Sequence, residues 1–312
     1  MSPSLVLVGP TSSGKTPLSL LLAKKLDGEI VSADSRQIYK HLDIGTAKPT
    51  KAELQSIPHH FIDIRELDEE YNAGVYGEQA REVIGDIQRR KRLPIMVGGS
   101  GLYVKSAIDG LFEGGGKDPE LRSQLQDRLE KTGLTAMFDE LKKVDPRAAS
   151  SMKEIKQRRV LRALEVFYIT GKPISTLHEA QRKEPALPVV QFALAWERKV
   201  LYERINARVE DMLRNGLVQE VESLVRRGYD RRLNALNTVG YKEMFQFLDG
   251  ALKYEEAVSL IQQNTRRFAK RQLTWFRSDQ RIQWVPVERD WTYEVLADLI
   301  IARFQKSVQK VH

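Results

Sequence analysis

The 312-residue sequence contains no cysteine. This absence excludes disulfide bonds, zinc sites with thiolate ligands and a cysteine nucleophile, and it fits a reducing compartment, so we expect a cytoplasmic protein. No apolar run approaches the ~20 residues that a membrane-spanning helix needs, so no membrane partner is expected. The sequence also lacks repeats and low-complexity segments. Because 41% of the residues are hydrophobic and 29% are charged, the composition is that of a globular protein.

The first third of the chain lacks net charge. Residues 1–110 contain 14 basic and 14 acidic side chains, whereas residues 111–312 contain 36 basic and 28 acidic ones and hold the whole formal net charge of +8. This asymmetry favours a polyanionic partner for the later part of the chain. Ordinary solvated surface charge is the alternative.

A phosphate-binding motif follows the first apolar segment. A strand expected at Leu5–Val8 leads into residues 9–16, Gly-Pro-Thr-Ser-Ser-Gly-Lys-Thr, which match G-x-x-x-x-G-K-[ST] in full. Backbone N–H groups of such a loop surround an anion, and the N-terminus of the following helix adds positive potential. We expect Lys15 to reach the terminal phosphate and the Thr16 hydroxyl to bind Mg²⁺.

Pro17 directly follows the motif. Proline fits the first turn of a helix but offers no N–H. A donor at this position would help to hold the innermost phosphate of a nucleoside triphosphate. The motif itself is typical of ATP-binding and other nucleotide-binding proteins, but Pro17 favours a ligand with two phosphates.

Two further strands are expected at Glu29–Ala33 and Leu93–Val97. The second ends in Gly98-Gly99-Ser100-Gly101 rather than in the Mg²⁺-binding aspartate of many nucleotide hydrolases. Because the carboxyl ends of parallel strands meet at one edge of a sheet, polar residues after both strands should surround the bound phosphates. These residues are Asp34, Ser35, Gln37 and Ser100. Asp34 could instead cap a helix or support a Mg²⁺ ion indirectly.

The middle of the chain contains residues that typically begin and end helices. Asp118-Pro119 and Asp145-Pro146 each predict a helix start, Gly133 predicts an end, and Gly171-Lys172-Pro173 ends the stretch that contains Leu161–Tyr168. We interpret 115–185 as a helical insertion domain. It interrupts an α/β core, formed by 1–114 and 186–312, with a P-loop NTPase-like parallel sheet flanked by helices.

The end of the chain should complete this core. The expected elements are strands at Val189–Trp196 and Ile282–Val287, a helix from about Arg198 to Asn215 with Gly216 as its cap, and a final helix from Tyr293.

Two basic clusters explain the charge asymmetry. One contains Lys153, Lys156, Arg158, Arg159 and Arg162, and the other contains Arg266, Arg267, Lys270, Arg271 and Arg277. At helical spacing the second cluster shares a broad face, which suits a phosphate backbone. Phe268, Trp275 and Phe276 accompany it; we expect these aromatic residues to pack in the core rather than to stack on bases.

Eight segments resemble the tRNA dimethylallyltransferase family, the bacterial tRNA isopentenyltransferases. They are residues 9–16, 34–39 (Asp-Ser-Arg-Gln-Ile-Tyr), 43–49 (Asp-Ile-Gly-Thr-Ala-Lys-Pro), 98–103 (Gly-Gly-Ser-Gly-Leu-Tyr), 162–166, 204–209, 239–243 and 270–277. They cover nearly the whole chain in the expected order. Two positions depart from the family pattern: Ser100 stands where threonine is usual, and Pro17 replaces a small residue.

The resemblance implies a reaction. The family transfers a dimethylallyl group from dimethylallyl diphosphate to N6 of the tRNA adenosine at position 37, beside the anticodon, giving N6-(dimethylallyl)adenosine. Diphosphate leaves, and Mg²⁺ assists. The implied partners are dimethylallyl diphosphate and the anticodon stem-loop of tRNA, and nothing in the sequence requires more than a monomer.

Residue roles follow from this chemistry. An adenine amino group is a poor nucleophile and must lose a proton as the N–C bond forms, and a general base typically contributes about 10²–10⁴-fold. Asp34 is the candidate base, while Lys15 and Ser100 are expected to stabilise the leaving group. The expected diphosphate-binding residues are Gly9, Pro10, Thr11, Ser12, Ser13, Gly14, Lys15, Thr16 and Arg208.

Some of these assignments have alternatives. Arg208 could instead form a surface salt bridge, and Arg204 lies one turn earlier on the same helix face. The target base must leave its stack to reach Asp34, with Gln37 offering an amide to its edge. The expected tRNA-binding residues are Asp34, Ser35, Arg36, Gln37, Ser100, Arg122, Arg158, Arg159, Arg162, Thr238, Gly240, Tyr241, Lys270, Arg271 and Arg277.

Two other functional classes share the phosphate loop. A small-molecule kinase would transfer the γ-phosphate of ATP, and the Gly-Gly-Ser strand end and Pro17 argue against it. A nucleotide-gated RNA-binding protein would perform no chemistry, and the residues around Asp34 argue against that. His59-His60 is expected to be structural, because no partners stand at metal-ligand spacing.

Overall fold

The computed structural model describes residues 3–110, 118–181 and 186–309. It divides the chain into two compact units, one formed by Met1–Ile108 with Leu187–His312 and the other by Asp109–Ala186. The boundary expected at 114/115 lies outside the described residues, as does residue 185 at the second expected boundary.

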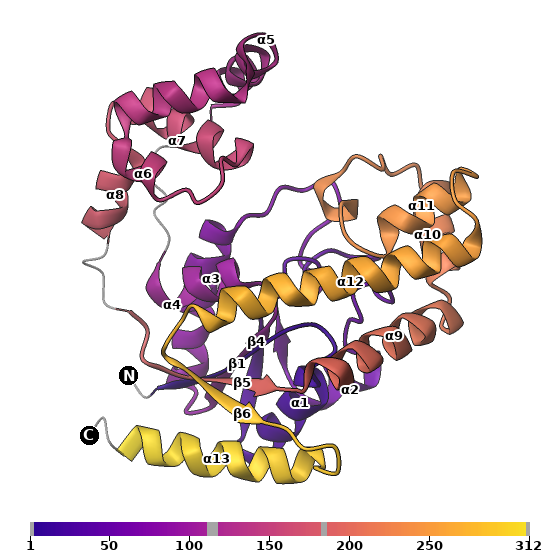
Figure 1. Ribbon diagram of the computed structural model, residues 1–312. Coiled ribbons are helices and arrows are strands. Elements are labelled where there is room, and N and C mark those ends of the chain that lie inside the picture. The colour runs from indigo at the N-terminus through magenta and orange to yellow at the C-terminus, as the bar shows by residue number, and fades with distance from the viewer. Residues whose placement is uncertain (1–2, 111–117, 182–185, 310–312) are drawn as a thin grey trace. The chain divides into compact units, whose positions relative to one another are not determined.

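A parallel sheet organises the larger unit (Figure 1). Its order is β3-β2-β4-β1-β5-β6, and every pair in this order is parallel. The strands are β1 (Ser4–Val8), β2 (Gly28–Ser32), β3 (His59–His60), β4 (Leu93–Gly98), β5 (Val189–Ala195) and β6 (Ile282–Pro286). Because Val8 pairs with Gly98 and Ser32 with Val97, the ends of β1, β2 and β4 lie at one edge. The expected parallel α/β core is confirmed.

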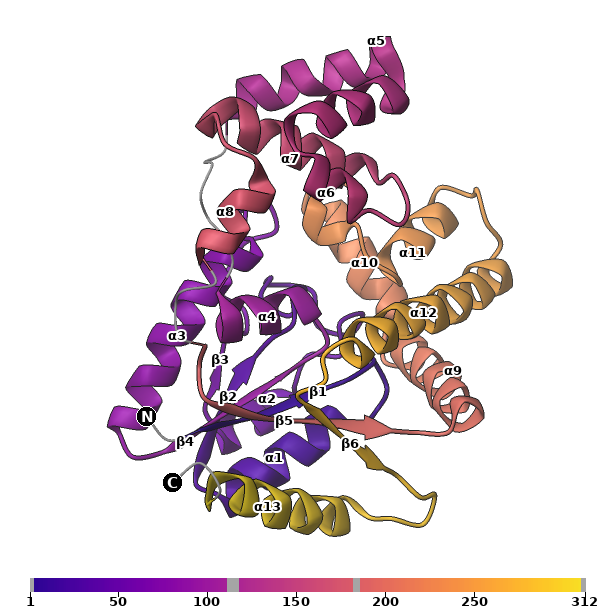
Figure 2. The ribbon, with the colours of Figure 1, turned by 60° about the vertical axis from the view of Figure 1, so that its left-hand side comes forward.

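Helices cover both faces of this sheet, so its central strands are apolar on both sides. On one face, α1 (Lys15–Lys25) and α13 (Tyr293–Gln309) pack against alternate strand residues (Figure 2). Their shared core includes Leu5, Leu22, Phe192 and Ile300, all fully buried. On the other face, α3 (Ala73–Arg89) packs against β2 and β4.

A group of helices follows β5 and stands beyond the strand ends. It comprises α9 (Arg198–Arg214), α10 (Leu217–Arg226), α11 (Tyr241–Leu248) and α12 (Tyr254–Arg277). In Figure 1 the long α12 lies along α9 and α11, in agreement with their contacts. Two short helices, α2 (Lys51–Ser56) and α4 (Gly101–Asp109), complete the larger unit together with a 3₁₀ turn at Asn234–Leu236.

The smaller unit is helical, as its helix-start and helix-end residues predict. It contains α5 (Pro119–Val144), α6 (Pro146–Ser150), α7 (Gln157–Thr170) and α8 (Ile174–Gln181). Asp118 caps α5 by accepting hydrogen bonds from two backbone N–H groups, and α5 breaks at Gly133, whose φ is 80°. Gly171 ends α7 with a φ of 68°, a left-handed conformation that glycine adopts without strain.

The two chain segments that flank the smaller unit meet at the sheet. The backbone N–H of Leu187 donates to the carbonyl of Ile108 at 2.9 Å, just before β5 begins. Among the residues that the structure describes, no helix combines the length and apolar character needed to span a membrane.

The edge strand β3 was not predicted, because two residues are too few to show a strand pattern. His60 Nε2 donates to the buried Glu29 carboxylate at 2.8 Å, and His59 Nδ1 lies 2.7 Å from the carbonyl of Ile57. The described residues contain no cluster of acidic and histidine side chains able to bind a metal. Both histidines make hydrogen bonds within the larger unit.

Candidate active site

The phosphate loop connects the end of β1 to the start of α1, as the sequence predicted. Gly14 has a φ of 91° at the start of α1, and Pro17 occupies its first turn without losing a helical hydrogen bond. Lys15 folds back over its own loop, where Nζ donates to the carbonyl of Pro10 at 2.6 Å. Burial, reinforced by the nearby charge of Arg208 and partly offset by Asp34, lowers the pKa of Lys15 to about 7.

Side chains from distant segments brace the outer surface of this loop. Arg204 Nε donates to the carbonyl of Ser12 at 2.9 Å, and Trp196 Nε1 donates to the carbonyl of Ser13 at 2.9 Å. The Arg204 guanidinium also lies 4.4 Å from the centre of the Trp196 ring. Arg204 therefore supports the loop from behind and does not line the cavity described below.

Gln272 links the loop to the neighbouring strand end. Its Oε1 accepts from the backbone N–H of Thr11 at 2.8 Å, and its Nε2 donates to the carbonyl of Gly99 at 3.0 Å.

Gly98 lies directly against the carbonyl of Ala33, and a Cβ on Gly98 would come within 2.1 Å of that oxygen. The close approach of β2 and β4 explains why glycine, rather than aspartate, ends β4.

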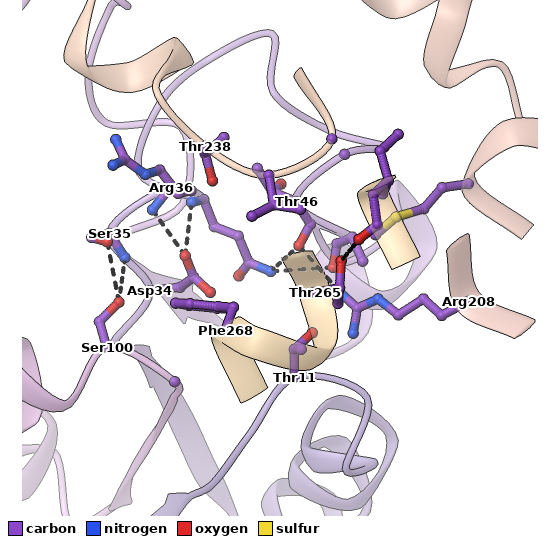
Figure 3. Close-up of a pocket in the computed structure, with 18 of the residues that line it drawn as sticks. Thr11, Asp34, Ser35, Arg36, Thr46, Ser100, Arg208, Thr238, Thr265 and Phe268 are labelled. Atoms are coloured by element: carbon purple, nitrogen blue, oxygen red, sulfur yellow. Dashed lines mark hydrogen bonds between the residues drawn. The ribbon is translucent and has the colours of Figure 1, made fainter. Parts of the chain in front are cut away.

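Asp34 begins a tight turn immediately after β2. Its Oδ1 accepts hydrogen bonds from the backbone N–H groups of Arg36 at 2.8 Å and Gln37 at 3.4 Å. Asp34 thus caps a turn through one oxygen, while the described residues give Oδ2 no hydrogen bond. Ser100 Oγ accepts from the Ser35 N–H at 2.9 Å, which fixes this turn to the end of β4 (Figure 3).

A cavity of about 900 Å³ opens over the strand ends, within the larger unit. One side of the cavity is cationic: Lys15, beside Thr16, lines it from the end of the phosphate loop, and Arg208 lines it from α9. Figure 3 shows Asp34 and Ser100 on a different part of the wall from Arg208. Apolar side chains from α9 and α12 complete the lining: Val209, Met212, Leu260, Ile261 and Phe268.

Arg208 is positioned for an anion. Its Nε is buried without a hydrogen-bond partner among the described residues, and its NH2 group makes a long hydrogen bond of 3.5 Å to the carbonyl of Thr46. Burial lowers its pKa, while Asp34 raises it. The surface salt bridge considered for Arg208 does not form among the described residues.

Most of the predicted site residues come together. The cavity lining includes the following of them: Thr11, Lys15, Thr16, Asp34, Ser35, Arg36, Gln37, Ser100, Arg208, Thr238, Gly240 and Arg271. The other predicted loop residues, Gly9, Pro10, Ser12, Ser13 and Gly14, form the backbone turn beside it. The side-chain amide of Gln37 donates hydrogen bonds to the carbonyls of Thr46 and Ala47, at 3.2 and 3.1 Å. Its N–H groups are therefore engaged within the protein.

Tyr241 is not available to an RNA as its motif suggested. Its side chain is fully buried at the start of α11, and its hydroxyl donates to Glu220 at 2.5 Å. Burial, reinforced by the nearby Glu220 carboxylate, raises the pKa of Tyr241 well above its usual value. The N-terminus of α11 is held separately, because Glu243 accepts from the Gly240 N–H and from Asn264.

The aromatic residues of α12 divide between core and surface. Phe276 is buried at 2% exposure, as expected, but Phe268 and Trp275 are 40% and 41% exposed, so that expectation is wrong for these two. Arg271 stands one turn from Phe268, with its guanidinium 5.7 Å from the ring centre. Phe268, Arg271 and Trp275 share one helix face, because they are three, four and seven residues apart.

The remaining basic residues are exposed to different degrees. Lys270 and Arg277 are exposed on α12, and Arg266 is bound to Asn206 of α9. In the helical unit Arg158 and Arg159 are exposed, while Arg122 and Arg162 both pair with the buried Glu165, at 3.5 and 3.0 Å. The Arg122 ion pair joins α5 to α7, whereas the Arg162 ion pair lies within α7.

Comparison with known proteins gives consistent results. The family described as IPP transferase matches residues 37–279. The tRNA dimethylallyltransferase of Pelotomaculum thermopropionicum is 46% identical over 299 residues, covering 96% of this chain and 95% of that protein. The protein of the same name from Caldanaerobacter subterraneus is 44% identical over 303 residues, with 95% of each chain covered.

Solved structures agree with these relatives. The full-length tRNA isopentenylpyrophosphate transferase of Bacillus halodurans superposes with a TM-score of 0.72 at 38% identity, covering 100% of both chains. A eukaryotic dimethylallyltransferase acting on tRNA gives a TM-score of 0.83 at 28% identity, covering 98% of this chain and 80% of that one.

Proposed function

Because the chain belongs to the IPP transferase family, we propose that it transfers a dimethylallyl group to N6 of the adenosine at position 37 of tRNA. The donor is dimethylallyl diphosphate, and the products are N6-(dimethylallyl)adenosine and diphosphate. The observation that carries the proposal is one cavity with two cationic side chains, Lys15 and Arg208, and a separate carboxylate, Asp34.

The cationic side of the cavity fits a diphosphate. Burial and repulsion by Arg208 lower the pKa of Lys15, burial lowers the pKa of Arg208, and Asp34 partly offsets both shifts. A bound dianion would relieve this repulsion and engage the Arg208 Nε. As the C–O bond of the donor breaks, the negative charge that develops on the leaving oxygen is stabilised by these groups and by the loop N–H groups.

Thr16 would hold Mg²⁺ in this arrangement. Its hydroxyl lines the cavity beside Lys15, and Mg²⁺ in such sites is typically bound by one or two protein oxygens together with phosphate oxygens and water. When bound, Mg²⁺ would supply further positive charge to the departing diphosphate.

Asp34 acts on the adenine. As N6 attacks the allylic carbon, the N–C bond forms, the C–O bond breaks with its electron pair on the diphosphate, and the N6 proton passes to Asp34 Oδ2. Oδ1 remains on the Arg36 and Gln37 N–H groups, so the turn stays ordered during transfer. Ser100 keeps this turn in place through Ser35.

The apolar lining suits the five-carbon group. Val209, Met212 and Ile261 offer hydrocarbon surface next to the diphosphate side, which shields the allylic carbon from water while positive charge develops there. We also expect a monomer to be active, because nothing in the sequence requires a second copy. The tRNA substrate and the absence of cysteine are consistent with a cytoplasmic enzyme.

The basic and aromatic surface suits an anticodon stem-loop. Arg271, Lys270 and Arg277 offer charge to phosphates, and Phe268 and Trp275 offer exposed rings to unstacked bases. Modification of a stacked base requires that it flip out, and Phe268 lines the cavity that would receive it. In the helical unit by itself, Arg158, Arg159, Arg122 and Arg162 also offer charge to RNA phosphates.

The test is transfer from a labelled donor. Unmodified tRNA is incubated with Mg²⁺ and labelled dimethylallyl diphosphate, with labelled ATP in parallel. We expect label in tRNA only from the allyl donor. Asp34→Asn retains an acceptor for the turn but removes the base, and it should lower kcat by about 10²–10⁴-fold. Label from ATP would indicate a kinase, and no transfer from either donor would leave only an RNA-binding protein.

A further inference from the structure

Three consecutive backbone N–H groups converge on one carboxylate outside the cavity. Glu220, in the first turn of α10, accepts from Asp43 and Ile44 through Oε2, at 3.0 and 2.8 Å, and from Gly45 through Oε1 at 3.1 Å. Glu220 does not line the cavity. Its carboxylate therefore fixes a loop without touching the space where substrates would bind.

Tyr241 completes this arrangement. Its hydroxyl is the fourth donor to Glu220, and its ring lies flush against Gly45, where a Cβ would come within 2.4 Å of a ring carbon. Any side chain at position 45 would displace the loop or the ring. The buried Tyr241 and the carboxylate together form a clamp on residues 43–45.

The other side of the same loop faces the site. The carbonyls of Thr46 and Ala47 accept from the amide of Gln37, and the carbonyl of Thr46 accepts from Arg208. Gln37 in turn donates its backbone N–H to Asp34. The loop thus connects the turn that holds the proposed base to the arginine proposed to bind the diphosphate, and Figure 3 shows Thr46 between these groups.

The loop backbone needs such support. Ala47 has a φ of 46°, a left-handed conformation that is strained for a residue with a side chain and persists only where the surroundings impose it. Lys48 adds a second anchor, because its buried ammonium contacts Asp43 at 2.6 Å and also pairs with Asp63. Both ends of the strained segment are therefore held by charged groups.

We propose that Glu220 is a positioning residue for the transfer reaction: through the loop of residues 43–47, it sets the placement of the Asp34 turn relative to Arg208. This inference rests on the proposed function. A carboxylate is required at position 220 because all four of its partners donate hydrogen bonds. A glutamine amide would place its own N–H donors opposite some of these donors, which would then lose their acceptor.

The test compares two charge-neutralising substitutions on the same helix. Glu220→Gln should lower kcat at least tenfold while the KM for tRNA changes less than threefold. The matched control is Glu222→Gln, whose side chain is 41% exposed and, within the part of the chain that the structure describes, forms an ion pair with Arg226 at 3.6 Å; it should retain wild-type kcat. Circular dichroism at the assay temperature verifies that both variants are folded. Wild-type kcat in folded Glu220→Gln would overturn the inference.

A double-mutant cycle separates positioning from a general loss of stability. Gln37→Ala cuts the link between the loop and the Asp34 turn. If Glu220 acts through this link, Glu220→Gln should lower kcat less than threefold in the Gln37→Ala background, against tenfold or more in the wild type. Equal losses in both backgrounds would refute the proposed route. Transfer by the wild-type enzyme, measured in the same series, tests the proposed function independently.

Discussion

Raising the pH from 7.5 to 8.5 should weaken the binding of dimethylallyl diphosphate about eightfold through Lys15 alone. In the ligand-free protein, burial and the charge of Arg208 lower the pKa of Lys15 to about 7. A bound diphosphate favours the ammonium form and raises this pKa again. Affinity is therefore greatest below pH 7 and falls as the pH rises toward the pKa of the bound form.

The magnitude follows from the protonated fraction of Lys15. With a pKa of about 7, roughly one quarter of the free protein carries this proton at pH 7.5 and about 3% carries it at pH 8.5. Binding at pH 8.5 should therefore take up nearly one proton from the buffer. Isothermal titration calorimetry in buffers of different ionisation enthalpy measures that uptake directly, at constant Mg²⁺ and ionic strength.

Two variants isolate the lysine from the titration of the ligand itself. Lys15→Met should bind weakly at every pH and lose the part of the pH dependence that comes from the protein. Lys24→Met, on the exposed side of the same helix, should behave like the wild type. An unchanged slope in Lys15→Met, or no proton uptake by the wild type, would refute the reasoning.

Two further predictions concern RNA binding and stability. Arg271→Ala should weaken tRNA binding and reduce the slope of log affinity against log salt by about one, whereas Phe268→Ala should weaken binding by about 1–3 kcal/mol with an unchanged slope; filter binding from low to high salt measures both, and equal slopes would exclude a phosphate contact by Arg271. Glu29→Gln should lower Tm by about 5 °C at pH 7, because hydrogen bonds from Arg90 and His60 lower the pKa of Glu29 to about 2. This stabilisation is present above the pKa of about 4.3 in the unfolded chain and is lost as the pH falls toward 2, so melting curves of the two proteins should converge in acid; a constant difference would contradict the assignment.

Local patterns predicted the parts of the site that lie close together in sequence. The phosphate loop, the Asp34 turn and the glycine-rich end of β4 each follow a buried strand, and parallel strands bring such ends to one edge. The same reasoning predicted the helical unit from its Pro and Gly boundaries. Each of these features depends on residues within about one turn of one another.

Contacts between distant residues could not be predicted in this way. Gln272 bonds to Thr11 from 261 residues away, and Glu220 bonds to Gly45 from 175 residues away. A glutamate in the first turn of a helix looks like ordinary helix chemistry, so nothing in its surroundings indicated a partner loop. The exposure of Phe268 and Trp275 could not be predicted either, because their positions beside the apolar stripe of the helix are compatible with both a buried and an exposed side chain.

The hydrogen bond between Leu187 and Ile108 has a consequence for how this chain could change over time. It closes a long excursion of the polypeptide at a single point on the scaffold, so the strand pairings on either side do not depend on the length or content of the excursion. Loop closure becomes only slightly more costly as a loop lengthens. The helical unit can therefore be enlarged, shortened or replaced as a cassette, while the sheet that carries the chemistry keeps its register.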